Sequence, residues 1–413
     1  MVPSGWKEEK LENLASVERG KFSARPRNDP KYYGGDIPFV QTGDIAAAKT
    51  FLCKYTQTLN QNGLKVSKLF PINTILITIA ANIGDTAITT FEVACPDSLV
   101  AIEPYRDKAN SFWLNMVLET HKNELESKAT QNAQKNINLQ VLKPLKVLTP
   151  PLPEQQKIAQ ILSTWDKAIS TTESLIANSQ QQKKSLMQQL LTGKKRFSGL
   201  EGDWIEVKLG NAVSLMKSGL SRKLETENIG IAVIRSNNIG ERYTRNDDLK
   251  YWYKNDPQGA QVNNYILDDG DILINFINSM SQIGKTCIYK KYNGLDAIYT
   301  TNLLRLKADT NIVTPDFLFY LTKTEHYLTN IQAITKPAVN QASFTTKEFG
   351  NISLLLPALP EQQKIASVLT AADQEINTLQ QKLTHLKQEK KALMQQLLTG
   401  KRRVKIDNET EAA

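Results

Sequence analysis

The chain has few of the residues on which disulfide formation, metal binding and proton transfer depend. Its 413 residues include only 3 cysteines and 3 histidines. Cys53, Cys95 and Cys287 are isolated and form no CxxC pair, so we interpret them as small buried residues in a reducing compartment. The histidines occur in no HExxH or triad-like setting. We therefore predict no catalytic residue and no metal site in this chain.

Long apolar runs and glycine-rich phosphate loops are also missing from the sequence. The longest apolar runs, such as residues 75–81, are far too short to cross a bilayer. The opening MVPSGWKEEK has no apolar signal-peptide core, so we expect a cytoplasmic protein. Gly284-Lys285-Thr286 resembles the end of a P-loop, but Ser279 occupies the position of the required upstream glycine. The sequence therefore offers no nucleotide-binding motif.

The balance of charge is the first positive indication. Lysine and arginine total 51 against 42 acidic residues, which gives a formal charge of +9. A basic chain is suited to a polyanionic partner such as nucleic acid, although charge alone is a weak indication. A length of 413 residues predicts two or more domains.

One segment of about 45 residues occurs twice, and the rest of the chain is organised around it. LPEQQKIA…LMQQLLTGK begins at Leu152 and again at Leu359, without a gap and with more than half of the positions identical. Between the two conserved ends, apolar residues recur in alternating steps of three and four, as in a coiled coil. A proline follows each first leucine, and Gly193 and Gly400 are suited to ending a helix. We predict two long antiparallel helices.

Packing along the coiled-coil seam does not require the two ends of these helices to have identical sequences. A coiled coil used only for dimerisation is the simpler alternative, but it does not explain them. We therefore predict that the ends are used twice to dock partners, through Glu154, Gln155, Gln156, Gln188, Gln189, Glu361, Gln362, Gln363, Gln395 and Gln396.

The segments before each helix follow one plan with different residues. Each opens on Trp-x-x-x-Lys-Leu-x-Asn or a close variant, continues with a strand that runs into a polar turn, and ends in a polar loop. Short strands mixed with helices predict an α/β or α+β fold for both, with a pseudo-two-fold relation. The predicted domains are a first head at 1–150, a helix at 151–197, a second head at 198–357, a helix at 358–404 and a disordered tail at 405–413.

One pattern resembles a nuclease. Pro96-Asp97 precedes Glu126-Ser127-Lys128, a loose PD…ExK spacing in which acids would hold a metal. The second head keeps Pro315-Asp316 but has no matching ExK, and such patterns are common by chance. Nuclease activity therefore remains a minor alternative, which would be lost on Glu126→Ala.

Recognition chemistry explains the polar loops better, because Arg, Lys, Asn and Gln reach phosphates and base edges. The same loops are polar in both heads while their residues differ, as two readers of different sequences require. The candidates in the first head are Arg25, Arg27, Tyr32, Tyr33, Gln41, Thr42, Asn82, Gln134, Lys135 and Asn136. Those in the second are Arg222, Lys223, Arg235, Ser236, Asn237, Asn238, Asn278, Ser281, Gln282, Lys336, Asn340 and Gln341.

With the doubled P-x-LPEQQKIA…LMQQLLTGK segment and the twin openings at Trp6 and Trp204, the chain resembles the DNA specificity subunits of type I restriction-modification systems. The resemblance covers essentially the whole chain. It implies two target-recognition domains, each reading one half of a split asymmetric site in double-stranded DNA, and two helices that set the gap between the halves.

The resemblance also implies partners and cofactors. Two methyltransferase subunits would dock on the helices, and restriction (translocase) subunits would join a larger complex. S-adenosylmethionine, ATP and magnesium would be bound by those partners and not by this chain. The competing class is a coiled-coil adaptor whose heads bind protein, which predicts binding that is insensitive to DNA.

Overall fold

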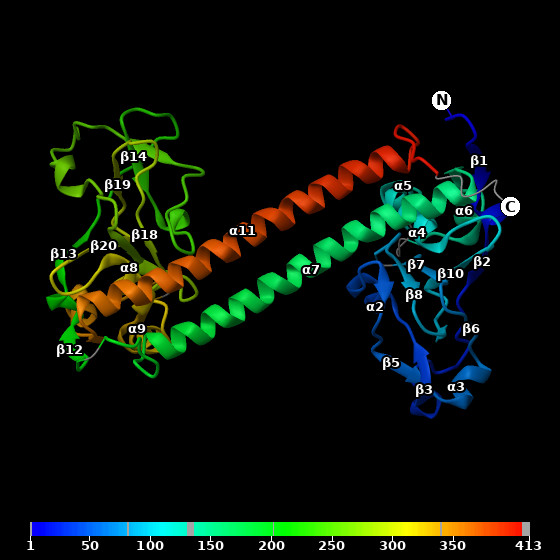
Figure 1. Cartoon of the computed structure of the whole chain (residues 1–413), viewed down its shortest axis with the longest axis horizontal. Helices are drawn as coiled ribbons and strands as arrows, with labels where there is room; N and C mark the ends of the chain where they lie inside the picture. The colour runs from blue at the N-terminus through cyan, green and yellow to red at the C-terminus, as the bar shows by residue number, and fades with distance from the viewer. Residues whose placement is uncertain (1, 81, 130–135, 201, 339–340, 407–413) are drawn as a thin grey trace. The chain divides into compact units, whose positions relative to one another are not determined.

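Two compact units and two long helices make up the chain (Figure 1). The computed structural model describes residues 2–80, 82–129, 136–200, 202–338 and 341–406. Unit 1 comprises Met1–Glu173 and Gln381–Ala413, and unit 2 comprises Ser174–Gln380. Each unit therefore contains one head together with part of both long helices.

The long helices are α7 (Leu152–Leu190) and α11 (Leu359–Leu397), at equivalent positions of the repeat. Both begin where the sequence predicted, and both end a few residues before the predicted stop residues Gly193 and Gly400. Gly193 and Gly400 follow with φ of +69° and +67°, a conformation that a residue without Cβ adopts freely. The prediction of two long helices with glycine ends is confirmed.

In unit 1 the first head is built on two sheets and a terminal strand pair. The five-stranded sheet has the order β2-β10-β7-β8-β4, and the four-stranded sheet has the order β5-β3-β9-β6. The strands are β1 (Lys7–Lys10), β2 (Ala15–Arg19), β3 (Tyr33–Phe39), β4 (Phe51–Leu52), β5 (Gln57–Leu59), β6 (Leu69–Phe70), β7 (Ile75–Thr78), β8 (Thr86–Thr89), β9 (Val93–Ala94), β10 (Leu99–Pro104) and β11 (Lys146–Thr149).

Helix α4 (Ser111–Thr120) packs on the larger sheet and joins it to α7. Trp113 and Leu125 share one core with Ile75, Ile158 and Leu162, so the start of α7 is part of the head's interior. The head's helical segments are α1 (Leu11–Leu14), η1 (Pro30–Tyr32), α2 (Thr42–Ala47), α3 (Gln61–Lys65), α4 (Ser111–Thr120), α5 (Lys122–Ser127) and α6 (Leu139–Leu142).

Unit 2 repeats this plan around the second head. A four-stranded sheet (β13-β20-β16-β18) and two three-stranded sheets (β15-β14-β19 and β17-β22-β21) accompany the terminal pair β12-β23. The strands are β12 (Ile205–Lys208), β13 (Val213–Ser218), β14 (Ile231–Ile234), β15 (Lys250–Trp252), β16 (Ile272–Asn275), β17 (Ile277–Asn278), β18 (Thr286–Ile288), β19 (Ala297–Tyr299), β20 (Leu303–Ala308), β21 (Lys336–Pro337), β22 (Ala342–Ser343) and β23 (Ser353–Leu356).

Helices α8 (Pro315–Leu321), α9 (Glu325–Ile334) and α10 (Thr346–Gly350) of the second head lie in the same core as the ends of the long helices within unit 2. Phe317 and Phe349 pack in one cluster with Leu190, Ile365 and Leu369. The other helical segments are η2 (Leu209–Asn211), η3 (Ser236–Asn238) and η4 (Val262–Tyr265). Most strand pairs are antiparallel, with parallel pairs at β3–β9, β4–β8 and β14–β19, so the predicted mixed α+β class is confirmed.

Within each unit, α7 and α11 run antiparallel and are joined by an ion pair on the seam. Lys390 of α11 pairs with Asp166 of α7 in unit 1, and Lys183 of α7 pairs with Asp373 of α11 in unit 2. Both pairs use the same two positions of the repeat. Lys183 and Lys390 occupy seam positions where the 3.5-residue pattern would otherwise place an apolar residue. Each lysine is neutralised by an aspartate of the opposite helix, so the two helices can still pack along the seam.

Among the helices that the structure describes, none is both long and apolar enough to span a membrane.

Candidate nucleic-acid interface

Three predicted contact residues of the first head meet around one hollow. Arg27, Tyr33 and Gln41 line a cavity of about 660 Å³. The Tyr33 hydroxyl donates to the Arg27 carbonyl oxygen at 2.6 Å, and the Gln41 amide donates to Gln57 Oε1 at 3.1 Å. The hollow thus presents a guanidinium, a phenol and two amides, groups that can recognise phosphate and base edges.

The hollow is held in shape by an ion pair and by an aromatic cluster below it. Arg27 Nη2 lies 2.7 Å from Asp97 Oδ2, and this hydrogen bond lowers the pKa of Asp97. The ring of Phe22 packs on Phe39 with centroids 4.9 Å apart. Asp97 belongs to the nuclease-like pattern, and its carboxylate is ion-paired with Arg27. Among the described residues, no group of three or more His, Cys, Asp or Glu is placed to hold a metal ion.

Gln57 is a member of this site that the sequence did not predict. It lies on β5 directly opposite Phe39 of β3 in the antiparallel register. Only that pairing brings its amide to Gln41, and no local pattern in the sequence indicated it.

The other described candidates of the first head are more scattered. Arg25 is exposed, Tyr32 is half-buried against Phe22, and Thr42 opens α2. Asn82 and Asn136 are both exposed, and Asn136 bridges to Ala80, two residues before Asn82. Gln134 and Lys135 lie outside the described residues.

The small sheet β17-β22-β21 collects one group of candidates in the second head. Asn278 pairs with Ala342, and Pro337 pairs with the same residue from the other side. Candidates far apart in the sequence are thereby brought to one three-stranded sheet and its connections: Asn278, Ser281, Gln282, Lys336 and Gln341. Ser281, Lys336 and Gln341 are exposed, and Lys336 also pairs with Glu348 at 3.0 Å. Asn340 lies outside the described residues.

The second group follows strand β14. Asn237 is exposed and Ser236 is half-buried, while Lys223 is exposed in the segment before the strand. Arg235 Nη2 lies 2.8 Å from Asp248 Oδ2, so an acidic neighbour fixes this guanidinium. These four stay predicted contacts.

One prediction in this head is wrong, and a second predicted residue is held by an ion pair. Asn238 is fully buried, and its amide donates to the carbonyl oxygens of Arg245 and Asp247 at 3.2 and 3.0 Å. The Arg222 guanidinium lies against Asp256, whose side chain is fully buried, and its hydrogen bonds lower the pKa of Asp256 to about 2. Asn238 stabilises its loop from within and is not free to read DNA, whereas Arg222, whose side chain is 15% exposed, stays a predicted contact.

Four of the ten predicted docking residues are wrong for the same reason. Glu154, Gln155, Glu361 and Gln362 are at most 2% exposed. Each glutamine clamps its helix to its head: Gln155 bonds Asn110 N and the Lys108 and Pro150 carbonyls, and Gln362 makes the matching bonds to Thr314, Ile312 and Pro357. These residues are identical because both helices need the same clamp. Gln156, Gln188, Gln363, Gln395 and Gln396 are exposed and Gln189 is half-buried, so these six stay predicted docking residues.

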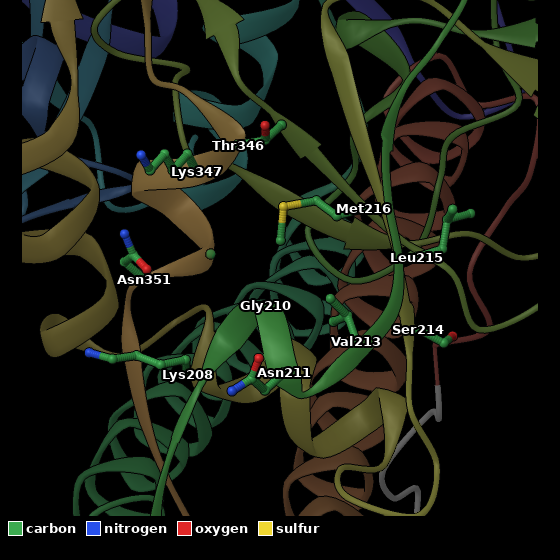
Figure 2. A pocket seen from close by; sticks show the side chains of 11 residues that line it. Lys208, Gly210, Asn211, Val213, Ser214, Leu215, Met216, Thr346, Lys347 and Asn351 are labelled. Carbon is green, nitrogen blue, oxygen red and sulfur yellow. The ribbon is translucent and has the colours of Figure 1, made fainter.

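A further hollow of about 480 Å³ lies in unit 2, beside η2 and α10. Figure 2 shows the side chains that line it. Lys208 and Lys347 carry amines on its rim, and Met216 contributes its thioether. None of the predicted contact residues lines it, so it is separate from the recognition groups.

Comparison with known proteins bears on the classes left open by the sequence. A profile of the family described as "Type I restriction modification DNA specificity domain" matches residues 3–178 and 201–388. The chain belongs to this family. Each match covers one head and a large part of the helix that follows it, so the repeating element of this chain is a head with its helix.

Individual relatives carry the same description. The putative type I restriction enzyme MjaX specificity subunit of Methanocaldococcus jannaschii is 30% identical over 206 residues, which is 50% of this chain and 48% of that protein. The MjaVIII specificity subunit of the same organism is 25% identical over 324 residues, 75% of this chain and 74% of that protein. The alignment thus spans about half of the first relative and three quarters of the second.

Among solved structures, the type I restriction-modification system S subunit from M. genitalium has a TM-score of 0.60 at 17% identity, over 95% of this chain and 96% of that chain. This likeness supports the fold.

One position distinguishes the two heads of this specificity-family chain by charge. Glu119 and Lys323 lie nine residues after the N-caps of α4 and α8, which are Asn110 and Thr314. Burial raises the pKa of Glu119 to about 7, and burial lowers the pKa of Lys323 to about 8. The two heads thus carry opposite ionisable groups at equivalent, half-buried places.

We expect opposite pH dependences of stability from these two groups. Folded Glu119 keeps a proton that the unfolded chain loses, so its contribution is lost as pH rises from about 4.5 to 7. Unfolded Lys323 keeps a proton that the folded chain lacks, so its contribution grows as pH rises from about 8 to 10.5. Glu119→Gln and Lys323→Met should each flatten one limb of the thermal-stability profile, by about 2–3 kcal/mol in unfolding free energy. Glu126→Gln on exposed α5 serves as the control, and equal curves for all variants would contradict the assignment.

Proposed function

We propose that this chain is the sequence-specific DNA-binding subunit of a type I restriction-modification complex and has no catalytic activity of its own. The observation that carries the proposal is the family match over both heads and their helices. Each head reads one half of a split, asymmetric site in double-stranded DNA. The long helices set the gap between the halves.

The polar groups of the two heads support separate reading of two sequences. The first head offers the hollow lined by Arg27, Tyr33 and Gln41, and the second offers the small sheet with Lys336 and Gln341. Because these groups differ in composition, the two half-sites differ. Phosphate contacts from the basic surface supply affinity that falls as salt rises.

The methylating and cleaving chemistry belongs to partner subunits in this proposal. Two methyltransferase subunits dock on the helices, with Gln156 and Gln363 as repeat-related candidates, and restriction subunits join them. S-adenosylmethionine, ATP and magnesium are bound by those partners. The complex acts in the cytoplasm, where it meets genomic DNA.

The proposal is tested by modified-base sequencing of genomic DNA from cells with and without the gene. We expect one split methyladenine motif to disappear with the gene. An unchanged methylation pattern, in cells that contain the methyltransferase bound to this chain, would refute the proposal. A protein-binding adaptor would give that unchanged pattern.

Gln41→Ala should relax the bases tolerated in one half of the motif and leave the other half intact. The reason is that an amide is suited to a bidentate contact with one base, worth about 1–3 kcal/mol of discrimination. Gln282→Ala in the second head is the matched variant and should change only the opposite half. Changes in both halves from either variant would contradict the assignment of one half-site to each head.

A further inference from the structure

Each head contacts the long helices at a second place besides the glutamine clamp. In unit 2 this contact is made by Arg242, whose side chain is only 12% exposed. Its guanidinium lies 2.6 Å from Asp316 Oδ1 on the head, 3.0 Å from Thr370 Oγ1 and 3.4 Å from Asp373 Oδ2, the last two on α11. Tyr320 of the head donates to the same Asp373 carboxylate at 2.7 Å. The Asp373 side chain thus joins head and helix.

Unit 1 has the corresponding contact with different chemistry. Thr50 Oγ1 donates to Asp166 Oδ2 at 3.2 Å, and Asp166 is the repeat equivalent of Asp373. Thr50 is also the structural equivalent of Arg242. Its carbonyl accepts from Ile88 N of β8 at 2.9 Å, as the Arg242 carbonyl accepts from Ile288 N of β18 at 2.7 Å. The two recognition heads differ widely in sequence, yet both reach the same aspartate position from the same point of the fold.

Each aspartate also holds the second long helix. Lys390 pairs with Asp166, and Lys183 pairs with Asp373. Asp166 and Asp373 therefore each tie three elements together: the head, the helix that follows the head and the antiparallel helix. In unit 1, Glu173 of α7 does the same through Lys49 of the head and Lys387 of α11. We call the two aspartate contacts the anchors, and they comprise Thr50–Asp166–Lys390 and Arg242–Asp373–Lys183.

Each anchor lies about three turns of helix away from the glutamine clamp of the same head. Asp373 follows Gln362 by eleven residues of α11, and Asp166 follows Gln155 by the same number on α7, which is about 16 Å of helix. Beside Arg242 and Asp373 lies a groove of about 890 Å³ between head and helix, so the anchor is a discrete polar contact next to open space. A head fixed at two points cannot rock about either one, whereas a head fixed only at the clamp can.

We propose that Arg242 and Asp373, with Thr50 and Asp166 as their counterparts, are positioning residues that determine which gap between half-sites the protein accepts. This inference rests on the proposed function. Neighbouring base pairs are offset by about 3.4 Å along the DNA axis, so a head that moves by a few ångströms can accept a site with one base pair more or less. The anchors act on the gap and not on the bases, because their side chains are engaged with the helices.

The two anchors differ in strength. Arg242 makes charged hydrogen bonds to two carboxylates, while Thr50 makes one neutral-to-charged bond at 3.2 Å. Loss of Arg242 should therefore relax the gap more than loss of Thr50.

The experiment uses the full chain with its methyltransferase partner and a plasmid library in which both half-sites are kept while the gap varies by one or two base pairs. Methylation of each gap is read by modified-base sequencing. We expect the unmodified chain to prefer one gap by about tenfold or more, the discrimination that one mismatched base pair typically gives. Arg242→Ala and Asp373→Asn should reduce this preference to about threefold or less, with both half-motifs unchanged, and Thr50→Ala should have a smaller effect. Arg242→Lys should restore part of the preference because it keeps the charge.

A strict single gap in Arg242→Ala and Asp373→Asn would overturn the proposal, as would relaxed base choice at an unchanged gap. If Arg242→Ala does not fold, the gap preference of Asp373→Asn and Arg242→Lys tests the proposal. Both variants keep a polar side chain at the anchor that can still form hydrogen bonds with the neighbouring groups. If the unmodified chain directs no methylation of a split motif, the proposed function itself fails. A failure of the inference alone leaves that motif in place.

Discussion

Deletion of residues 175–181 together with residues 375–381 will shorten the gap between the two methylated half-sites by about three base pairs. Seven residues are two turns of helix and about 10 Å of rise, against about 3.4 Å per base pair. Removing a whole heptad keeps the apolar seam in register, because the pattern repeats every seven residues. Both half-motifs should stay the same, since neither deletion touches a head. Modified-base sequencing measures the gap and the half-motifs together.

The matched control is the same deletion in α7 alone. In the antiparallel pair, Lys183 meets Asp373 and Lys390 meets Asp166, and a deletion in one helix breaks this correspondence on one side of the cut. We expect that variant to lose stability and directed methylation. A double deletion that methylates at the original gap would refute the role of the helices as the spacer.

Arg196→Ala will lower the unfolding free energy of unit 2 by about 3 kcal/mol, because it leaves a buried carboxylate without its cation. Glu361 at the start of α11 is 2% exposed, and Arg196 Nε and Nη2 lie 3.0 and 2.7 Å from its two oxygens. In the described part of the chain, Arg196 is the only side chain that donates to this carboxylate. Thermal or urea unfolding of the full chain measures the loss.

Arg403→Ala is the matched variant in unit 1 and should cost less. Arg403 makes the equivalent fork to Glu154 at 2.7 and 2.8 Å, but Trp6 Nε1 also donates to Glu154 at 3.0 Å. Trp204, the matching tryptophan of the second head, has no hydrogen-bond partner for its indole nitrogen among the described residues. A loss in Arg403→Ala as large as that in Arg196→Ala would contradict the importance of the tryptophan bond.

The sequence predicted those features that local patterns encode. Helices α7 and α11 follow from a 3.5-residue period with proline at the start and glycine at the end, and such signals act within a few residues. The strand that runs into a polar turn in each head, β3 and β14, follows from a short apolar run that turn residues end. The internal repeat and the twin openings together indicate the family, because both are patterns of the sequence itself.

The sequence could not separate exposed polar residues from polar residues that hold the fold together. Glu154 and Gln155 were predicted to dock partners, but Arg403 and Trp6, from the two ends of the chain, bury and bond Glu154. Asn238 was predicted to contact DNA, but it bonds a loop that lies near it only after folding. An asparagine in a polar turn gives the same local pattern in either role.

By itself, therefore, the sequence determined the long helices, the two-headed repeat and the family, because each depends on patterns repeated along the chain. Only the tertiary structure decided which polar side chains remain available. It joined Gln57 to Gln41 through strand register, withdrew Glu361 and Gln362 into clamps, and brought Thr50 and Arg242 to equivalent aspartates on different helices. The physical reason is that exposure and ion pairing are set by segments far apart in sequence, and a single chain's sequence does not record which of them meet.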